Sequence, residues 1–101
     1  MQFGLSEAAV LAIQNILKKY VEIQKVIIYG SRAKGNHKKG SDIDLVILAP
    51  KLGISALLQI ENELDELLLP YKVDLSLYHY IENIDLLDHI ERMGIVFYAK
   101  T

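Results

Sequence analysis

Asp42 and Asp44, which stand one residue apart, are the side chains in this sequence that are best suited to chemistry. In an extended strand both would project from the same face, because successive side chains alternate between the two faces. Carboxylates held this close repel each other and raise each other's pKa, an arrangement that makes sense when a divalent cation lies between them. Hard cations such as Mg2+ prefer oxygen ligands and keep waters and substrate phosphates as the remaining ones. The spacing therefore favours a metal site that bridges to phosphates.

A third acidic residue, Asp74, stands in a segment that alternates apolar and polar side chains, Lys72 to Tyr78 (KVDLSLY). If this segment is a strand, its apolar positions face the core and Asp74 projects from the opposite face. A charge at the start of such a strand needs a partner, and a metal beside Asp42 and Asp44 would supply one. The sequence thus predicts three carboxylates around one site.

The segment from Gly30 to Ser41 (GSRAKGNHKKGS) carries four basic side chains and no acid, although the whole chain has a net charge of -2. Gly30 permits a close turn, Ser31 offers a hydroxyl, and backbone N–H groups at a helix start can hold phosphate oxygens. Basic side chains can add charge-assisted contacts to phosphate. The sequence leaves open which of the lysines in this segment make such contacts: Lys34, Lys38 and Lys39.

The glycine spacing of this segment also matches a P-loop, which has to be considered as an alternative. Asn36 and His37 follow Gly35, where that motif needs Lys and then Ser or Thr, so the P-loop is excluded. The histidines of the chain show no metal-ligand spacing, and we expect surface or packing roles for all of them: His37, His79 and His89.

Helical and strand patterns alternate along the chain. The expected helices are one capped by Ser6 and reaching Tyr20, one marked by Leu57, Leu58, Leu64, Leu67 and Leu68 and ending before Pro70, and one from Asn83 to Met93. The expected strands are Lys25 to Tyr29, Ile43 to Leu48, Lys72 to Tyr78 and Ile95 to Tyr98, with a short helical turn near Ser31 to Asn36. This order predicts an α/β protein with one sheet covered by helices.

Composition limits the class of protein. The 101 residues, 51% of them hydrophobic, predict one domain over residues 1–101. The absence of cysteine excludes a thiolate nucleophile and a disulfide framework. No apolar run is long enough for a membrane span and the N-terminus lacks signal-peptide features, so we expect a cytoplasmic protein without membrane contact. The slightly negative net charge gives no reason to expect direct nucleic-acid binding.

The motifs taken together resemble a known superfamily. Gly30-Ser31, then Asp42-Ile43-Asp44, then a strand with Asp74 occur in the order seen in the nucleotidyltransferases that include DNA polymerase beta. Over nearly the whole chain, GSRAKG, SDIDL, KVDLSLY and MGIVFY are similar to the minimal nucleotidyltransferases. The resemblance implies a polymerase beta-like fold, with a small mixed sheet flanked by helices.

The same resemblance implies roles for individual residues. ATP is the implied co-substrate, and two Mg2+ ions, or Mn2+ in their place, are the implied cofactors. The implied catalytic and metal-binding residues are Asp42, Asp44 and Asp74. The implied nucleotide-binding residues are Gly30, Ser31, Arg32 and Ser41.

The resemblance further implies a partner, a small helical HEPN protein that is often a ribonuclease toxin. The chain would act as antitoxin by transferring AMP to a hydroxyl, such as a tyrosine, of that partner. Two alternatives stay open: neutralisation by steric occlusion without transfer, and transfer to a small molecule held by a separate subunit. Apolar side chains on both faces of Ile95 to Tyr98 fit either a surface that a partner covers or a strand inside the sheet.

Overall fold

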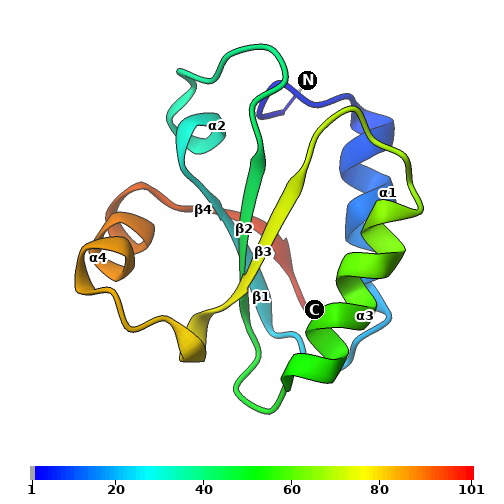
Figure 1. Cartoon of the computed structure of the whole chain (residues 1–101), viewed down its shortest axis with the longest axis vertical. Coiled ribbons are helices and arrows are strands. Elements are labelled where there is room, and N and C mark those ends of the chain that lie inside the picture. Colours follow the sequence, from blue (N-terminus) through cyan, green and yellow to red (C-terminus); the bar gives the residue numbers. More distant parts are fainter. Residues whose placement is uncertain (1) are drawn as a thin grey trace.

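The computed structural model describes residues 2–101 and arranges them around one mixed β-sheet (Figure 1). The strands are β1 (Lys25–Tyr29), β2 (Ile43–Leu48), β3 (Val73–Leu77) and β4 (Ile95–Ala99). The helices are α1 (Glu7–Lys18), α2 (Ser31–Lys34), α3 (Ile54–Asp65) and α4 (Ile84–Met93), and a short 3-10 turn, η1 (Tyr78–Tyr80), follows β3. Among these helices none has the length and apolar character that crossing a membrane requires.

The strands lie side by side in the order β3-β2-β1-β4. β1 runs antiparallel to both of its neighbours, β2 and β4, whereas β3 runs parallel to β2. A parallel pair needs a long crossover connection, and α3 supplies it between β2 and β3. The small mixed sheet flanked by helices that the sequence predicted is therefore confirmed.

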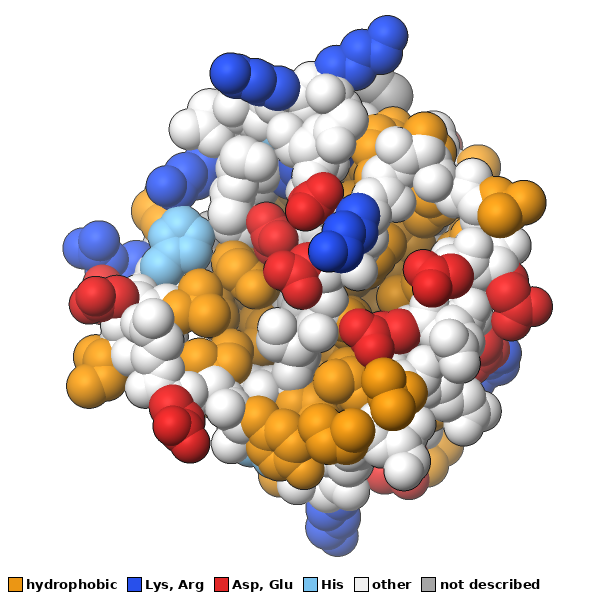
Figure 2. All heavy atoms as spheres, in the orientation of Figure 1, with side chains coloured by type: hydrophobic (Ala, Val, Ile, Leu, Met, Phe, Trp, Pro, Cys, Tyr) orange, Lys and Arg blue, Asp and Glu red, His pale blue; other side chains and the backbone are white. Residues whose placement is uncertain are grey.

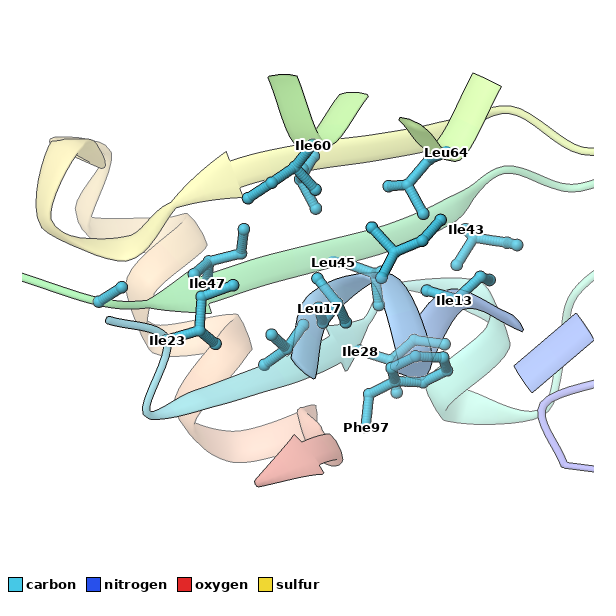
Figure 3. Packing of buried hydrophobic residues seen from close by; sticks show 14 of the residues in the cluster. Ile13, Leu17, Ile23, Ile28, Ile43, Leu45, Ile47, Ile60, Leu64 and Phe97 are labelled. Carbon is cyan, nitrogen blue, oxygen red and sulfur yellow. The ribbon is translucent and has the colours of Figure 1, made fainter. Parts of the chain in front are cut away.

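One face of the sheet is covered by α1 and α3, and the main hydrophobic core lies between them (Figure 3). Alternate residues of β2 point into this core, and Ile43, Leu45 and Ile47 are all fully buried. Leu17 of α1 and Ile60 of α3 meet them from the helices. Burial of each such side chain contributes roughly 1.5–3 kcal/mol, so this face supplies most of the apolar stabilisation.

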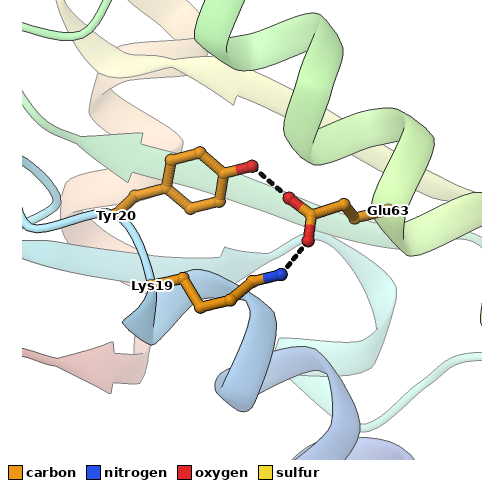
Figure 4. A network of polar contacts seen from close by, with 3 residues as sticks. All are labelled: Lys19, Tyr20 and Glu63. Atoms are coloured by element: carbon orange, nitrogen blue, oxygen red, sulfur yellow. Dashed lines mark hydrogen bonds and ion pairs between the residues drawn. The ribbon is translucent and has the colours of Figure 1, made fainter.

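The α1 and α3 layer is also tied together by a polar network (Figure 4). Lys19 and Tyr20, just after α1, both donate to the carboxylate of Glu63 on α3. These hydrogen bonds lower the pKa of Glu63, Lys19 contributing most. The pKa of Tyr20 rises to about 12, first because of burial and then because of the Glu63 carboxylate.

The predicted helix starts are confirmed at two places, whereas the first two main helices end earlier than expected. α1 ends at Lys18 and does not reach Tyr20. The Ser6 hydroxyl accepts from the Ala9 amide at 3.1 Å at the start of α1, and the Asn83 side chain caps α4 in the same way. The second main helix ends earlier than its leucines suggested. α3 stops at Asp65, and Leu68 lies beyond it in a left-handed conformation (φ 54°) with 87% of its surface exposed.

The opposite face of the sheet is covered only in part, by α4 and η1. A small second core forms there from Tyr29, Val46 and Ile90. Its partly buried members are Ile27, Tyr78, Ile81 and Leu86. Because this core is small, much of the face remains open around the predicted aspartates.

The last strand, β4, lies at an edge of the sheet and not in its interior. The alternative that placed Ile95 to Tyr98 inside the sheet, with helices on both sides, is therefore wrong. Phe97 points into the main core and is 4% exposed, whereas Ile95 and Val96 remain 43% and 51% exposed. The pairing of β4 with β1 contains a register shift between Val26 and Ile27.

Candidate active site

Strand pairing places two of the predicted acids next to each other. In the parallel pair of β2 and β3, Asp44 is the register partner of Asp74. Both side chains lie on the α4 face, because Leu45 and Leu75, which follow them, point into the main core. Asp42 stands just before β2 and two residues from Asp44. Figure 2 shows acidic side chains gathered over the upper part of these two strands.

The electrostatics of the acids show how near they lie to one another. The pKa of Asp44 is raised, most strongly by partial burial and then by the negative charges of Asp74 and Asp42. Tyr29, on the neighbouring strand β1, also has a raised pKa. Burial is again the main cause, a hydrogen-bonding interaction with Ser76 opposes it, and the charges of Asp44 and Asp74 add to it. The face thus carries concentrated negative charge with a neutral phenol beside it.

This donor set fits a divalent metal by its chemistry. It consists of carboxylate oxygens, which Mg2+ and Mn2+ prefer, and their mutual repulsion would be relieved by a cation. Within the described residues, no group of His, Asp or Glu has the spacing of a fully assembled ligand set. Asp42 and Asp74 are exposed, and exposed side chains change rotamer readily.

The turn that connects β1 to α2 packs directly against Asp44. Gly30 adopts a positive φ of 77°, a conformation that side chains with a Cβ rarely adopt. A Cβ at this position would lie 2.5 Å from Oδ2 of Asp44. Ser31 begins α2 immediately afterwards and is half-buried. The glycine therefore allows the backbone of the turn to lie against Asp44, and phosphate binding by this turn stays a prediction.

His89, for which the sequence suggested only a surface or packing role, lies at this turn. Its Nε2 accepts a hydrogen bond from the Gly30 amide at 3.2 Å. Its ring also meets the ring of Tyr29 edge-on, with 6.1 Å between centroids. His89 also lies near enough to Asp44 to oppose part of the rise in the pKa of that carboxyl. Because 59 residues separate His89 from Gly30, no local spacing could have placed it there.

The remaining predicted nucleotide-binding residues have structural contacts of their own. The guanidinium of Arg32 is buried, and the backbone carbonyl of Ser41 accepts from it. The Ser41 hydroxyl accepts from the Lys38 amide at 2.9 Å. Nucleotide contact by Arg32 and Ser41 stays a prediction. The exposed basic side chains of this segment are its three lysines: Lys34, Lys38 and Lys39.

Comparison with known sequences identifies a family. The model of the family described as "Polymerase beta, Nucleotidyltransferase" matches residues 12–101. A "putative protein adenylyltransferase" of Methanocaldococcus jannaschii is 35% identical over 71 residues, which cover 69% of this chain and 71% of that protein.

Comparison with solved structures supports the fold. A toxin–antitoxin crystal structure with AMP-PNP superposes with a TM-score of 0.73 and 22% identity, over 95% of this chain and 75% of the other. A complex of a tri-AMPylated HEPN toxin of Shewanella oneidensis with its MNT antitoxin gives a TM-score of 0.70 and 19% identity, over 95% and 74% of the two chains. At these identities the similarity is one of fold.

Proposed function

Because the chain belongs to the polymerase beta nucleotidyltransferase family, we propose that it is a metal-dependent enzyme that transfers AMP from ATP to a hydroxyl of a protein. The observation that carries this proposal is the register pairing of Asp44 with Asp74, with Asp42 beside them. Three carboxylates on one open sheet face repel one another in the metal-free protein, and such unfavourable clusters typically occur at functional sites. Identity of 35% to a protein named as an adenylyltransferase supports the choice of AMP.

In this proposal Asp42, Asp44 and Asp74 hold two Mg2+ ions, and Mn2+ can replace them. When bound, such ions neutralise charge that develops on the phosphates. Asp74 accepts the proton of the acceptor hydroxyl as its oxygen bonds to the α-phosphorus. The bond from that phosphorus to the oxygen bridging to the β-phosphate breaks, and pyrophosphate leaves.

The turn residues orient the triphosphate. Gly30 lets the backbone approach closely, and Ser31 offers its amide and hydroxyl to phosphate oxygens. Lysines of the segment between α2 and β2 are exposed and within the same loop, where they can attract ATP before it binds. Positioning and charge stabilisation are the main contributions that a protein makes to phosphoryl transfer.

The proposed acceptor is a tyrosine hydroxyl of a HEPN-family toxin in the cytoplasm, which the chain would neutralise as an antitoxin. Fold similarity to antitoxins solved in complex with HEPN toxins supports this choice of partner. A second candidate, neutralisation by occlusion without transfer, is favoured by the exposed apolar side chains of Ile95 and Val96 on edge strand β4.

One substitution separates the two candidates. Asp44→Asn keeps the shape of the side chain and removes one carboxylate, so transfer should fall by about a hundredfold or more. We would incubate wild type and variant with ATP, Mg2+ and a HEPN protein from the same genome, then measure added AMP by mass spectrometry and the remaining ribonuclease activity.

Asp65→Asn, at the exposed end of α3, is the matched carboxylate-to-amide control and should transfer as wild type does. Loss of both added AMP and neutralisation in Asp44→Asn supports the enzyme. Full neutralisation by Asp44→Asn without added AMP contradicts the transferase role and leaves occlusion.

A further inference from the structure

Arg32 is the one charged side chain among residues 2–101 that is buried, with 3% of its surface exposed. Its Nε and Nη2 donate to the carbonyl of Ser41 at 3.1 and 2.8 Å, and Nη1 donates to the carbonyl of Phe3 at 2.8 Å. The guanidinium carbon lies 4.5 Å from the centre of the Tyr71 ring, a cation–π geometry. Neither of the ion pairs formed by the described residues involves it.

The segments that Arg32 joins are the ones that carry the candidate site. Ser41 directly precedes Asp42, Tyr71 leads into the strand that carries Asp74, and Arg32 itself follows the phosphate-turn residue Ser31. The Ile43 amide donates to the carbonyl of Lys72 at 2.8 Å and joins the same two strand entrances. The Arg32 side chain thus contacts the residue just before Asp42 and a residue just before the strand that carries Asp74.

The third acceptor comes from a tight turn near the N-terminus. Phe3 and Gly4 both have positive φ values, 57° and 71°, and the Leu5 amide donates to the carbonyl of Gln2 at 2.8 Å. This turn presents the Phe3 carbonyl to Arg32, and the Phe3 ring packs near Phe97 of β4, with 6.1 Å between centroids. The guanidinium therefore links the loop before β2 to a turn that is anchored on the far edge strand.

We propose that Arg32 is a positioning residue, which fixes Asp42 through the Ser41 carbonyl, and not a ligand of the nucleotide phosphates. This inference rests on the proposed function, in which Asp42 holds a metal. A guanidinium suits the task because its planar fork donates in several directions at once, and a lysine ammonium lacks that fork.

The two roles predict opposite changes in metal affinity. If Arg32 bound phosphate, replacing it would remove a cation near the metal site, and the affinity for Mn2+ without nucleotide would stay constant or rise. If it positions Asp42, replacing it lets the loop move. Groups that orient metal ligands typically change affinity by 10–100-fold, so we expect a loss of about tenfold. Arg32→Lys should lose nearly as much affinity as Arg32→Gln, because both variants lack the planar fork, although lysine keeps the positive charge.

The experiment measures Mn2+ affinity by electron paramagnetic resonance, with no nucleotide, in wild type, Arg32→Lys and Arg32→Gln. Lys34→Gln is the matched control, since it removes the same charge from an exposed neighbour on α2. Amide exchange by NMR is the second measurement, at Ser41 and Leu5, whose amides are hydrogen-bonded in the two segments that Arg32 joins. Both amides should exchange at least several-fold faster in the Arg32 variants, and in Lys34→Gln they should not change.

Each outcome decides the matter. Weaker Mn2+ binding with faster exchange in both Arg32 variants supports positioning, whereas unchanged exchange or unchanged Mn2+ affinity overturns it. If wild type binds no Mn2+, the proposed function fails, and the amide exchange still decides whether Arg32 holds the loop. Should both Arg32 variants unfold, Tyr71→Leu removes the cation–π contact and keeps an apolar side chain against the main core. It must weaken Mn2+ binding in the same direction, or the proposal is wrong.

Discussion

Glu63 on α3 and Asp44 on β2 carry the same functional group, yet their pKa values move in opposite directions. Glu63 faces Lys19 and Tyr20, which hold its pKa below the ordinary value. Asp44 is partly buried beside two further carboxylates, which hold its pKa above the ordinary value. On the α1 and α3 face the carboxylate of Glu63 has hydrogen-bond donors, whereas on the α4 face the carboxylate of Asp44 lies beside two other acids.

The two faces also differ in the size of their apolar cores. The main core fills the space below α1 and α3, whereas the second core rests on Tyr29, Val46 and Ile90. Stability is therefore concentrated on one face and unfavourable charge on the other. Substitutions on the two faces should separate folding from catalysis, and the predictions below test that separation from the largest expected effect to the smallest.

Truncation in the main core should give the largest loss of stability. Leu17→Ala leaves a cavity at a fully buried position and should lower the free energy of unfolding by about 3 kcal/mol. Transfer by the molecules that remain folded should be unchanged. Ile90→Ala, in the second core, should cost about 2 kcal/mol and should also slow transfer, because it loosens the helix that carries His89. Urea denaturation and kcat measured below the transition check both, and equal kcat values for the two variants would contradict the separation.

Gly30→Ala should lower both the stability of the fold and the rate of transfer. Its positive φ adds strain of roughly 1–2 kcal/mol, and its Cβ would displace the Asp44 carboxylate, so we also expect about a tenfold slower transfer. Gly40→Ala is the matched control, since it has a φ of 83° with open space around the added Cβ. It should lose similar stability and keep its activity. The same fall in activity in both variants would show that strain, and not the Asp44 contact, matters.

His89→Phe keeps an aromatic ring against Tyr29 and removes the acceptor of the Gly30 amide. The lost hydrogen bond should lower the free energy of unfolding by about 1 kcal/mol. The Gly30 amide should exchange faster by NMR, because water replaces the imidazole. His79→Phe, on an exposed residue of η1, is the control and should leave this amide unchanged. If the Gly30 amide still exchanges slowly in His89→Phe, the turn does not depend on the hydrogen bond to His89.

The smallest effect is a difference in the pH dependence of metal-free stability. Glu63 has a lowered pKa, so its contribution is present above the ordinary glutamate pKa and is lost as pH falls through the folded value. Asp44 has a raised pKa, so stability is lost as pH rises from its ordinary pKa through the folded value. In chelator at pH 7, Glu63→Gln should therefore be less stable than wild type and Asp44→Asn more stable. Urea midpoints should show both differences shrinking as pH falls below roughly 4, and differences of the same sign at pH 7 would contradict the comparison.

Much of the fold follows from local patterns in the sequence. The short apolar runs Lys25–Tyr29 and Ile43–Leu48 became strands with the predicted bounds, because buried strands of this length need little besides β-branched residues. The run of leucines after Asp65 was misleading, since apolar spacing does not reveal where the backbone leaves the helix. The position of β4 at an edge likewise depends on strand pairing, which alternation of side chains does not encode.

In the candidate site, too, the sequence indicated the position of some residues and not of others. Strand alternation alone predicted Asp42 and Asp44 on one face and Asp74 on the corresponding face of its own strand. The strand register pairs Asp44 with Asp74 in this way, whereas Asp42 lies just before the strand. His89 and Arg32 acquire their places through contacts with residues far along the chain or through backbone carbonyls. A carbonyl acceptor leaves no trace in the sequence of its own residue, so such roles emerge only from the fold.

The parallel pairing of β2 with β3 has a consequence for synthesis of the protein. Asp42 and Asp44 leave the ribosome well before Asp74, and His89 follows later still, because α4 comes after β3 in the chain. Synthesis proceeds from the N-terminus, and a domain generally folds as one unit. A nascent chain therefore carries its phosphate turn and two of its acids long before the third acid can pair with them. The three acids can therefore come together only after β3 has emerged, and the turn at Gly30 gains its contact with His89 only after residues 84–93 have emerged.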